Sequence, residues 1–295
     1  MDGWKKNKGY FKINQKISAH TIVKNEARWI WYTIMSVIDF VDEYIIFDTG
    51  SNDGTNEIIE TIDNPKIKYI KCGEVSWSKH TEIRNKMLDI SKSDWVWVID
   101  GDEVYPYETA KSIVELMRNN KMAIGIIVKW WRCVGDIYHF RQYGDYTFFN
   151  KSDNWSIRAW NRNNYDISWE GDYWPPSDNI KRKGEESLSM SDPRLIVLDA
   201  PKYFHFTHLA RSNNKNYDEK IDPKRSTHRI DSYCFGLGVE IPDHVVYPEV
   251  FYIDRPSIVP LVTKRLGLIN SIINYINRYL VLKSINYIKR RLFPK

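Results

Sequence analysis

Short apolar runs alternate with stretches of helical spacing along the first 120 residues of the chain. The apolar runs predict strands at residues 17–23, 44–47, 67–70 and 95–99. Between them, apolar residues at helical spacing predict helices at residues 26–40, at 56–62, from Ser76 or Ser78 to about 90, and at 108–119. Wholly apolar strands that alternate with helices are typical of a mostly parallel sheet with helices on both faces. We therefore predict an α/β fold.

The pattern is less regular after residue 120. Apolar runs predict further strands at residues 123–131, 157–160, 194–198 and 203–206. Residues 170–194 are rich in Gly, Pro, Ser and charged side chains, which predicts a long loop. Residues 258–293 carry apolar side chains at alternating spacings of four and three, which predicts an amphipathic helical extension at this end of the chain.

Acidic side chains follow two of the predicted strands directly. Asp48 follows the strand at residues 44–47, and the stretch WVWVIDGDE places Asp100, Asp102 and Glu103 just after the strand at 95–99. Ligands of parallel sheets bind beyond the carboxyl ends of the strands, so we expect these carboxylates on one binding rim. Carboxylates this close together resist ionising unless a positive charge lies among them. The pattern therefore predicts a positive group at this rim.

Two interpretations of the acidic turn remain open from the residues alone. Carboxylate oxygens suit a hard cation such as Mg²⁺ or Mn²⁺, and Gly101 between them lets a ligand or backbone come close. Alternatively, the acidic residues cap the helix that starts near Tyr107. A short D-x-D stretch is common by chance, so the turn by itself does not decide between them.

Charge is distributed unevenly along the chain. The net charge is +5, but residues 255–295 hold nine basic residues and no acidic one, so residues 1–254 carry −4. A mildly acidic body argues against nucleic-acid binding. A basic amphipathic helix at 258–293 suits an anionic membrane surface, or it could dock on protein.

Three features bear on location. Cys72, Cys133 and Cys234 lie far apart without metal-ligand spacing, which favours reduced thiols in the cytoplasm. The basic N-terminal residues precede no apolar run typical of a signal peptide. No segment approaches the roughly 20 apolar residues of a membrane-spanning helix. We expect a soluble, cytoplasmic protein, with peripheral association at the cytoplasmic membrane face as a further possibility.

Four ordered motifs carry a resemblance to a known family. They are HTIVKNEARWI at residues 20–30, IIFDTGSNDGTNEII at 45–59, WSKHTEIRNKML at 77–88 and SDWVWVIDGDE at 93–103. Together they resemble the nucleotide-sugar-binding half of family 2 glycosyltransferases with the GT-A fold, in particular lipopolysaccharide-core glucosyltransferase-type enzymes. Those enzymes carry D-A-D-E where this chain has D-G-D-E. The resemblance is strong over residues 17–104 and thin over 105–210.

The resemblance implies a role for each motif. Asp48 would accept a hydrogen bond from the nucleotide base, most often uracil; the alternative is that it serves only as a helix cap or turn residue. Asp100 would contact the ribose or a metal-bound water, and Asp102 would ligate the metal that bridges the diphosphate. Arg84 and Lys79 would neutralise the leaving group, although Arg84 could instead form a surface ion pair. The implied nucleotide-sugar-binding residues are Val23, Asn25, Glu26, Asp48, Ser51, Asp53, Lys79, Arg84, Asp100 and Gly101.

The resemblance also implies an inverting reaction in which a carboxylate deprotonates the acceptor hydroxyl. Residues 156–174 resemble a family strand followed by a His-Glu pair, and Trp169-Glu170 stands in the place of that pair. Glu170 is therefore the candidate base, with Asp172 next. The segment KYFHFTHLAR offers His205, and less readily His208, as a further metal ligand.

Aromatic residues are abundant, with 12 Trp and 19 Tyr in 295 residues. Sugar rings pack against indole planes, so some Trp residues of the second half could line a saccharide groove, although most are expected in the core. The six that cluster there are Trp130, Trp131, Trp155, Trp160, Trp169 and Trp174.

The sequence as a whole predicts a metal-dependent inverting glycosyltransferase of GT-A (Rossmann-like) fold. It would use Mn²⁺ or Mg²⁺ and move a sugar from a nucleotide-diphosphate sugar, expected to be a UDP-sugar, to a saccharide or lipid-linked acceptor in glycan biosynthesis. We expect a basic extension at residues 1–16, a catalytic domain at 17–254 with donor (17–120) and acceptor (121–254) halves, and a basic helical tail at 255–295. An inactive GT-A scaffold recruited to a membrane by the tail is the alternative. A nucleotidyltransferase is disfavoured because TIVKNEARW lacks a glycine-rich loop.

Overall fold

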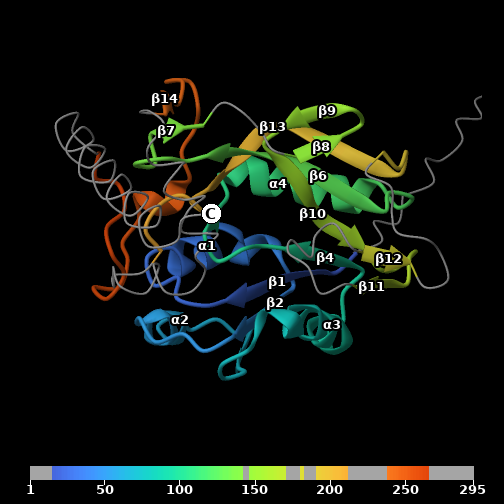
Figure 1. Ribbon diagram of the computed structural model, residues 1–295, viewed down its shortest axis with the longest axis horizontal. Helices are drawn as coiled ribbons and strands as arrows, with labels where there is room; N and C mark the ends of the chain where they lie inside the picture. Colours follow the sequence, from blue (N-terminus) through green and yellow to red (C-terminus); the bar gives the residue numbers. More distant parts are fainter. Residues whose placement is uncertain (1–14, 142–145, 171–179, 183–190, 212–237, 266–295) are drawn as a thin grey trace, which may run out of the picture.

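The computed structural model describes residues 15–141, 146–170, 180–182, 191–211 and 238–265. Within these ranges the largest element is an eight-stranded sheet of strand order β3-β2-β1-β4-β10-β6-β13-β5 (Figure 1). The strands are β1 (Ile17–Val23), β2 (Glu43–Asp48), β3 (Ile67–Lys71), β4 (Trp95–Val98), β5 (Glu103–Val104), β6 (Gly125–Arg132), β10 (Trp155–Asn161) and β13 (Leu195–His205).

The sheet is mostly parallel, as predicted. Strands β3, β2, β1 and β4 run in one direction, and β6 and β13 are parallel to each other. Strand β10 is antiparallel to both β4 and β6, and the short β5 is antiparallel to β13. The predicted α/β class is confirmed, with two strands that run against the others.

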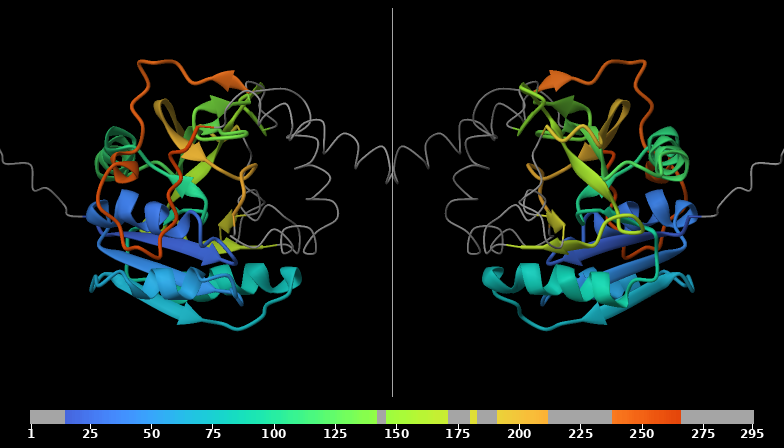
Figure 2. Two further views of the ribbon diagram at one scale, coloured as in Figure 1. Left: turned by 90° about the vertical axis from the view of Figure 1, so that its left-hand side faces the viewer. Right: turned by 90° about the vertical axis from the view of Figure 1, so that its right-hand side faces the viewer.

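Helices cover both faces of the sheet (Figure 2). On one face, Ile83 and Met87 of α3 pack against Ile45 and Phe47 of β2. On the other, the larger core joins α1, α2 and α4 to the sheet. The helical elements are α1 (Ile30–Val37), η1 (Ile38–Phe40), α2 (Thr55–Glu60), η2 (Trp77–Lys79), α3 (His80–Ile90) and α4 (Tyr107–Asn119).

Two helix starts differ from the prediction. The helix expected from residue 26 begins at Ile30, because residues 26–29 form a turn in which the Glu26 carbonyl accepts bonds from the backbone N–H groups of Trp29 and Ile30. The helix expected from Ser76 or Ser78 begins at His80, after η2. The Ser76 and Ser78 hydroxyls bond each other at 3.0 Å instead of capping it.

The second half differs more. The two strands expected at 194–198 and 203–206 form one strand, β13, whose register against β6 shifts between Leu198 and Tyr203. The expected loop at 170–194 contains a strand, β12 (Ile180–Arg182), paired with β11 (Ile167–Trp169). The remaining short elements are β7 (His139–Phe140), β8 (Tyr146–Phe148), β9 (Lys151–Asp153), β14 (Val239–Glu240) and η4 (Glu249–Phe251).

The beginning of the predicted C-terminal helix is not helical. Residues 258–265 form no helix, and Val259 and Val262 belong to the main core. The Tyr32 hydroxyl donates to the Pro260 carbonyl at 2.9 Å, and the Tyr138 hydroxyl to that of Thr263 at 2.9 Å. This segment therefore packs on the domain, and the rest of the predicted helix lies outside the described residues. None of the described helices has the length and apolar character needed to cross a bilayer.

Most of the Trp residues singled out in the second half lie in the core, as expected. Trp130, Trp155, Trp160 and Trp169 are each at most 4% exposed. Trp131 is partly buried and Trp174 lies outside the described residues. Burial of these rings leaves little indole surface for a saccharide groove.

Candidate active site

The carboxyl ends of β2 and β4 meet at one rim because β1 lies between them. Strand β1 pairs in parallel with both, so Asp48 at the end of β2 and Asp100 just beyond β4 flank the end of β1. The Thr21 hydroxyl strengthens this junction by donating to the Ile99 carbonyl at 2.8 Å and contacting the Tyr44 hydroxyl at 2.9 Å. The rim predicted from the strand pattern is therefore formed.

The acidic turn packs tightly under the loop that follows β1. The Thr33 hydroxyl of α1 donates to the Gly101 carbonyl at 3.0 Å. A Cβ added at Gly101 would lie 3.0 Å from Glu26 Cγ and 3.3 Å from Val23 Cγ2. Gly101 thus allows a close approach, and the groups that approach are the side chains of Val23 and Glu26.

Arginines supply positive charge at the acidic turn. The Arg158 guanidinium of β10 donates to Asp100 Oδ2 at 3.2 Å and forms an ion pair with Glu103. Arg84 of α3 brings Nη2 within 3.7 Å of Asp100 Oδ1. Both arginine side chains are at most 7% exposed. The positive group that the sequence required is therefore supplied, at least in part, by the protein.

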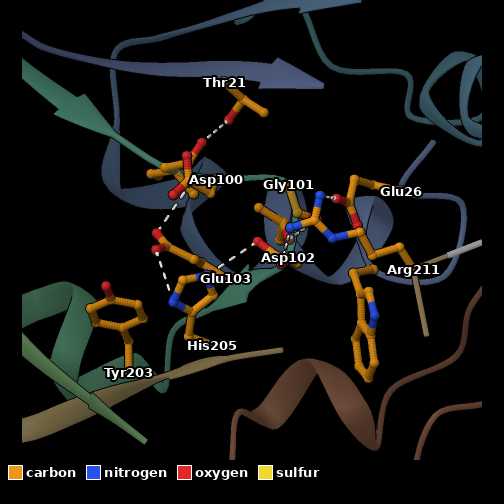
Figure 3. Close-up of polar contacts among 12 residues, drawn as sticks. Thr21, Glu26, Asp100, Gly101, Asp102, Glu103, Tyr203, His205 and Arg211 are labelled. Carbon is orange, nitrogen blue, oxygen red and sulfur yellow. Dashed lines mark hydrogen bonds and ion pairs between the residues drawn. The ribbon is translucent and has the colours of Figure 1, made fainter. Parts of the chain in front are cut away.

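A third arginine binds the other side of the turn (Figure 3). Arg211 donates to Asp102 Oδ2 at 3.1 Å and pairs with Glu26 Oε1 at 2.8 Å. The Arg211 segment is held by its backbone, since its carbonyl accepts from the Arg28 N–H at 3.0 Å. Asp102 is only 2% exposed, so it is buried against Arg211 in this structure.

Burial and these arginines set opposite pKa shifts on neighbouring acids. Burial raises the pKa of Glu103 to about 7, although Arg158 opposes the shift. Burial also acts to raise the pKa of Asp100, but Arg158 and Arg84 outweigh it and hold that pKa below its usual range. Burial lowers the pKa of Arg84, against the pull of Asp100. The turn therefore pairs an ionised Asp100 with a Glu103 that takes up a proton near neutral pH.

One group in the described part of the chain could hold a metal ion. It consists of Asp100, Glu103 and His205, whose ligand atoms lie within 4.8 Å of one another. The sheet places His205 beside Glu103, because these two residues are paired between β13 and β5. His205 Nε2 also lies 3.4 Å from Asp102 Oδ1 (Figure 3). Carboxylate oxygens with one imidazole nitrogen fit a divalent cation such as Mn²⁺.

This group overlaps the predicted metal ligands without being identical to them. Asp100 and His205 are brought together as predicted, and Glu103 joins them in place of Asp102. Glu103 is fully buried and accepts from the Tyr105 hydroxyl at 2.9 Å, whereas the Asp100 side chain is 28% exposed. Asp100 is therefore the more accessible of these two carboxylates. His208 lies in the turn after β13, outside this group.

One carboxylate oxygen of Asp48 accepts hydrogen bonds from its own loop, and the other accepts none from the described residues. Asp48 Oδ1 accepts from the backbone N–H groups of Gly50 and Ser51, each at 2.8 Å, as expected of a turn residue. Asp48 Oδ2 is buried and accepts no hydrogen bond from the described residues. A buried carboxylate oxygen without a donor suits a ligand N–H, which is the role that the family resemblance implies.

Other residues predicted to bind the nucleotide sugar form hydrogen bonds between the loop after β1 and the loop after β2. The Ser51 hydroxyl accepts from the Asn25 N–H at 2.9 Å, and Asn25 Oδ1 accepts from the Asn52 N–H at 2.8 Å. Asp53 Oδ2 accepts from the Ala27 N–H at 3.2 Å. Asn25 has a φ of 56°, a left-handed conformation that asparagine tolerates. These side chains therefore build the rim, and their contact with a ligand stays a prediction.

The remaining predicted residues lie along α3 and β11. Lys79 is exposed at the start of α3, and Arg84 is buried on that helix under Trp169, whose ring centroid is 5.0 Å from the guanidinium carbon. Arg84 is thus no surface ion-pair partner. Glu170 is exposed and follows Trp169 directly. Asp172 lies outside the described residues.

Sequence reasoning assigned no role to Arg158, Arg211 or Asn85. Arg158 stands in the strand SIRAW and Arg211 ends the segment KYFHFTHLAR, both of which carried part of the family resemblance. A buried carboxylate requires a counter-ion, which signals that such arginines exist. That signal does not identify them, because Arg158 and Arg211 lie 58 and 109 residues from the acids they bind.

Comparison with known proteins finds glycosyltransferases among the similar sequences. The chain is 27% identical over 216 residues to the SPbeta prophage-derived glycosyltransferase SunS of Bacillus subtilis (strain 168), covering 67% of this chain and 50% of that protein. It is 36% identical over 91 residues to an uncharacterized glycosyltransferase of Rickettsia bellii (strain RML369-C), covering 31% of this chain and 29% of that protein. The chain thus spans about half the length of SunS, and less of the second relative.

Among solved structures, TarS 1-349 of S. aureus in complex with UDP-GlcNAc aligns with a TM-score of 0.47 at 15% identity, covering 95% of this chain and 76% of that chain. Because this structural score is low, the assignment rests on sequence. Residues 18–179, more than half of the chain, match the family described as Glycosyl transferase family 2. This chain therefore belongs to glycosyltransferase family 2.

Proposed function

We propose that the chain transfers a sugar from a UDP-sugar to a saccharide or lipid-linked acceptor, with inversion and with the help of a divalent cation. The observation that carries the proposal is the meeting of Asp48 and Asp100 at one rim of a family 2 chain. Asp48 would bind the nucleotide base through its unbonded oxygen, and Asp100 would act at the diphosphate end of the sugar donor. The rim between them has carboxylates suited to both tasks.

The proposed cation is held by Asp100 and His205, with Asp102 as the third ligand implied by the family resemblance. A bound cation would stabilise negative charge on the departing diphosphate. Arg84 and Arg158 lie against the two oxygens of Asp100 and keep this carboxylate ionised at neutral pH. Glu103 is the competing third ligand, since its ligand atom lies within reach of Asp100 and His205.

Glu170 is the proposed general base, which would deprotonate the acceptor hydroxyl. It is exposed at the end of β11, next to a Trp169 that contacts Arg84, and Arg84 in turn contacts Asp100. A base in this position would lie on the acceptor side of the rim and take the proton of the attacking hydroxyl. Asp172 is the second candidate for the same role.

A donor screen tests the proposal. Nucleotide release would be followed from UDP-glucose, UDP-galactose, UDP-N-acetylglucosamine and GDP-mannose with Mn²⁺, for the intact chain and for Asp100→Asn. We expect release from one UDP-sugar and a decrease of about 100- to 1,000-fold in the variant, as for loss of a group that stabilises developing charge. Asp63→Asn, an exposed carboxylate in the turn before β3, is the matched control and should keep full activity.

Ligand assignment follows from two more variants. Asp102→Asn should raise the Mn²⁺ concentration needed for half-maximal activity, whereas Glu103→Gln should not. The reverse result would make Glu103 the third ligand. Activity that persists in the presence of EDTA would contradict a role for a metal ion.

The alternative is an inactive scaffold with the same fold. It predicts that Mn²⁺ with UDP leaves the melting temperature unchanged, whereas a ligand that binds the native state raises it. We further propose a cytoplasmic location, with the basic residues of 255–295 beside an anionic membrane face. Co-sedimentation with phosphatidylglycerol vesicles, compared with neutral phosphatidylcholine vesicles, tests that placement.

A further inference from the structure

Asn85 holds the backbone of Trp169 in the way a neighbouring strand would. Its Nδ2 donates to the Trp169 carbonyl at 2.9 Å, and its Oδ1 accepts from the Trp169 N–H at 2.8 Å. In an antiparallel sheet, paired residues exchange the same two bonds between their backbones. A side chain of α3 thus takes the place of a strand beside β11, which lies next to α3 (Figure 1).

The preceding residue holds the side chain of the same tryptophan. The Arg84 guanidinium carbon lies 5.0 Å from the centroid of the Trp169 ring, and Trp169 is 3% exposed. Arg84 Nη2 reaches Asp100 Oδ1 at 3.7 Å on its other side. Two consecutive residues of α3 therefore fix both the ring and the backbone of Trp169 relative to Asp100.

Helix α3 is itself fixed to the sheet. Its buried residues Ile83 and Met87 pack on β2, the strand that ends in Asp48. The connection from Asp48 to Trp169 thus passes through packed side chains and the Asn85 hydrogen bonds, and that from Asp100 through the Arg84 ion pair and the Arg84–Trp169 ring contact. Because Glu170 follows Trp169 directly, these contacts also restrict the position of the Glu170 backbone.

We infer that Asn85 is a positioning residue for Glu170, which sets the proposed base at the acceptor side of the donor rim. The inference rests on the proposed function, because it concerns the placement of the base of that reaction. Asn85 needs no contact with the donor to act in this way. A displacement of about 1 Å in such a group can lower turnover about 100-fold.

The test compares Asn85→Asp and Asn85→Ala with the intact chain. Asn85→Asp keeps the side-chain size but replaces the donor to the Trp169 carbonyl with an oxygen, so it disturbs the link even if Asn85→Ala does not fold. We expect kcat for nucleotide release, measured on the UDP-sugar that the screen selects, to fall about 100-fold. The affinity for UDP with Mn²⁺ should stay unchanged, which a general loss of structure would not produce. Asn119→Ala, at the exposed end of α4, is the control and should match the intact chain.

A double-mutant cycle with Glu170→Gln sharpens the test. If Asn85 acts only through Glu170, then Asn85→Asp should cause little further loss in a chain that already carries Glu170→Gln, because residues that act as a unit are not additive. Additive losses, an unchanged kcat in both Asn85 variants, or a parallel loss of UDP affinity would each overturn the inference while leaving the proposed function intact. An intact chain that neither binds UDP with Mn²⁺ nor releases nucleotide from any donor would overturn the proposed function, and the inference with it.

Discussion

The two acidic loops of the rim are stabilised in different ways. In the loop after β2, Asp48 is bonded by backbone N–H groups two and three residues further on. In the turn after β4, Asp100 and Asp102 are bound by Arg158 and Arg211, which lie far along the chain. One loop is satisfied locally, and the other depends on the packing of distant strands.

This difference concerns stability as well as chemistry. Neutral backbone donors next to Asp48 impose no charge that must be matched elsewhere. The buried ion pairs of the other turn leave uncompensated charge if one partner is removed, which is more costly than losing a neutral hydrogen bond. Substitutions at the β4 turn should therefore affect folding, whereas those at Asp48 should affect ligand binding alone.

The largest effect is expected for Arg158→Met. This change leaves Glu103 and Asp100 without their shared buried partner and should lower the free energy of unfolding by about 3–5 kcal/mol. Urea denaturation followed by tryptophan fluorescence would measure it. Adding Glu103→Gln to the same chain should restore part of the loss, and Arg118→Met, on the exposed last turn of α4, should change stability little. Equal stability of Arg158→Met and Arg118→Met would contradict the role of the ion pairs.

The next effect is a dependence of stability on pH through Glu103. Its pKa is about 7 in the folded chain against 4.5 for an unperturbed glutamate, because the side chain is buried. Between these values the folded state holds a proton that the unfolded state has lost, so stability falls as pH rises through this window. The shift corresponds to a decrease on the order of 3 kcal/mol.

Denaturation of the intact chain and of Glu103→Gln between pH 4.5 and pH 8 would isolate this contribution as the difference between the two. Glu115→Gln, an exposed residue of α4, should show the same pH dependence as the intact chain. A constant difference across the window would show that Arg158 keeps Glu103 ionised throughout.

The smallest effect is expected for Asp48→Asn. The asparagine Oδ1 can still accept from Gly50 and Ser51, so the melting temperature should stay unchanged. Replacing the unbonded oxygen with an NH₂ group should weaken UDP binding about tenfold, the worth of one hydrogen bond to a charged group. Calorimetric titration with UDP and Mn²⁺ measures it. Unchanged affinity for UDP would show that Asp48 does not bind the nucleotide base. A large fall in melting temperature would show that Asp48 also stabilises the fold, contrary to the difference proposed between the two loops.

The comparison also separates what could be predicted from what could not. The strands and helices of residues 17–119 were predicted to within a few residues, because hydrophobic periodicity is a local property of the chain. The second half was predicted less well, since the long β13 continues through residues 199–202, where the apolar pattern is interrupted. Pairing with β6 up to Leu198 and again from Tyr203 holds both parts in one strand, across a shift of register between them.

The same limit applies to the tail. Its apolar spacing predicted a helix from residue 258, yet Val259 and Val262 are buried in the core from a segment without helical structure. Spacing alone cannot distinguish a helix from a segment that packs against an existing surface. The division of the chain at residues 16, 120 and 254 stays a prediction.

By itself, then, the sequence determined the α/β order of the first half, the family, and the placement of Asp48 and Asp100 at strand ends. Only the tertiary structure decided that Arg84, Arg158 and Arg211 neutralise the acidic turn, that Glu103 joins Asp100 and His205, and that Asn85 holds Trp169. Strand ends follow from local periodicity, whereas the partner of a buried charge or amide depends on which distant elements pack against it.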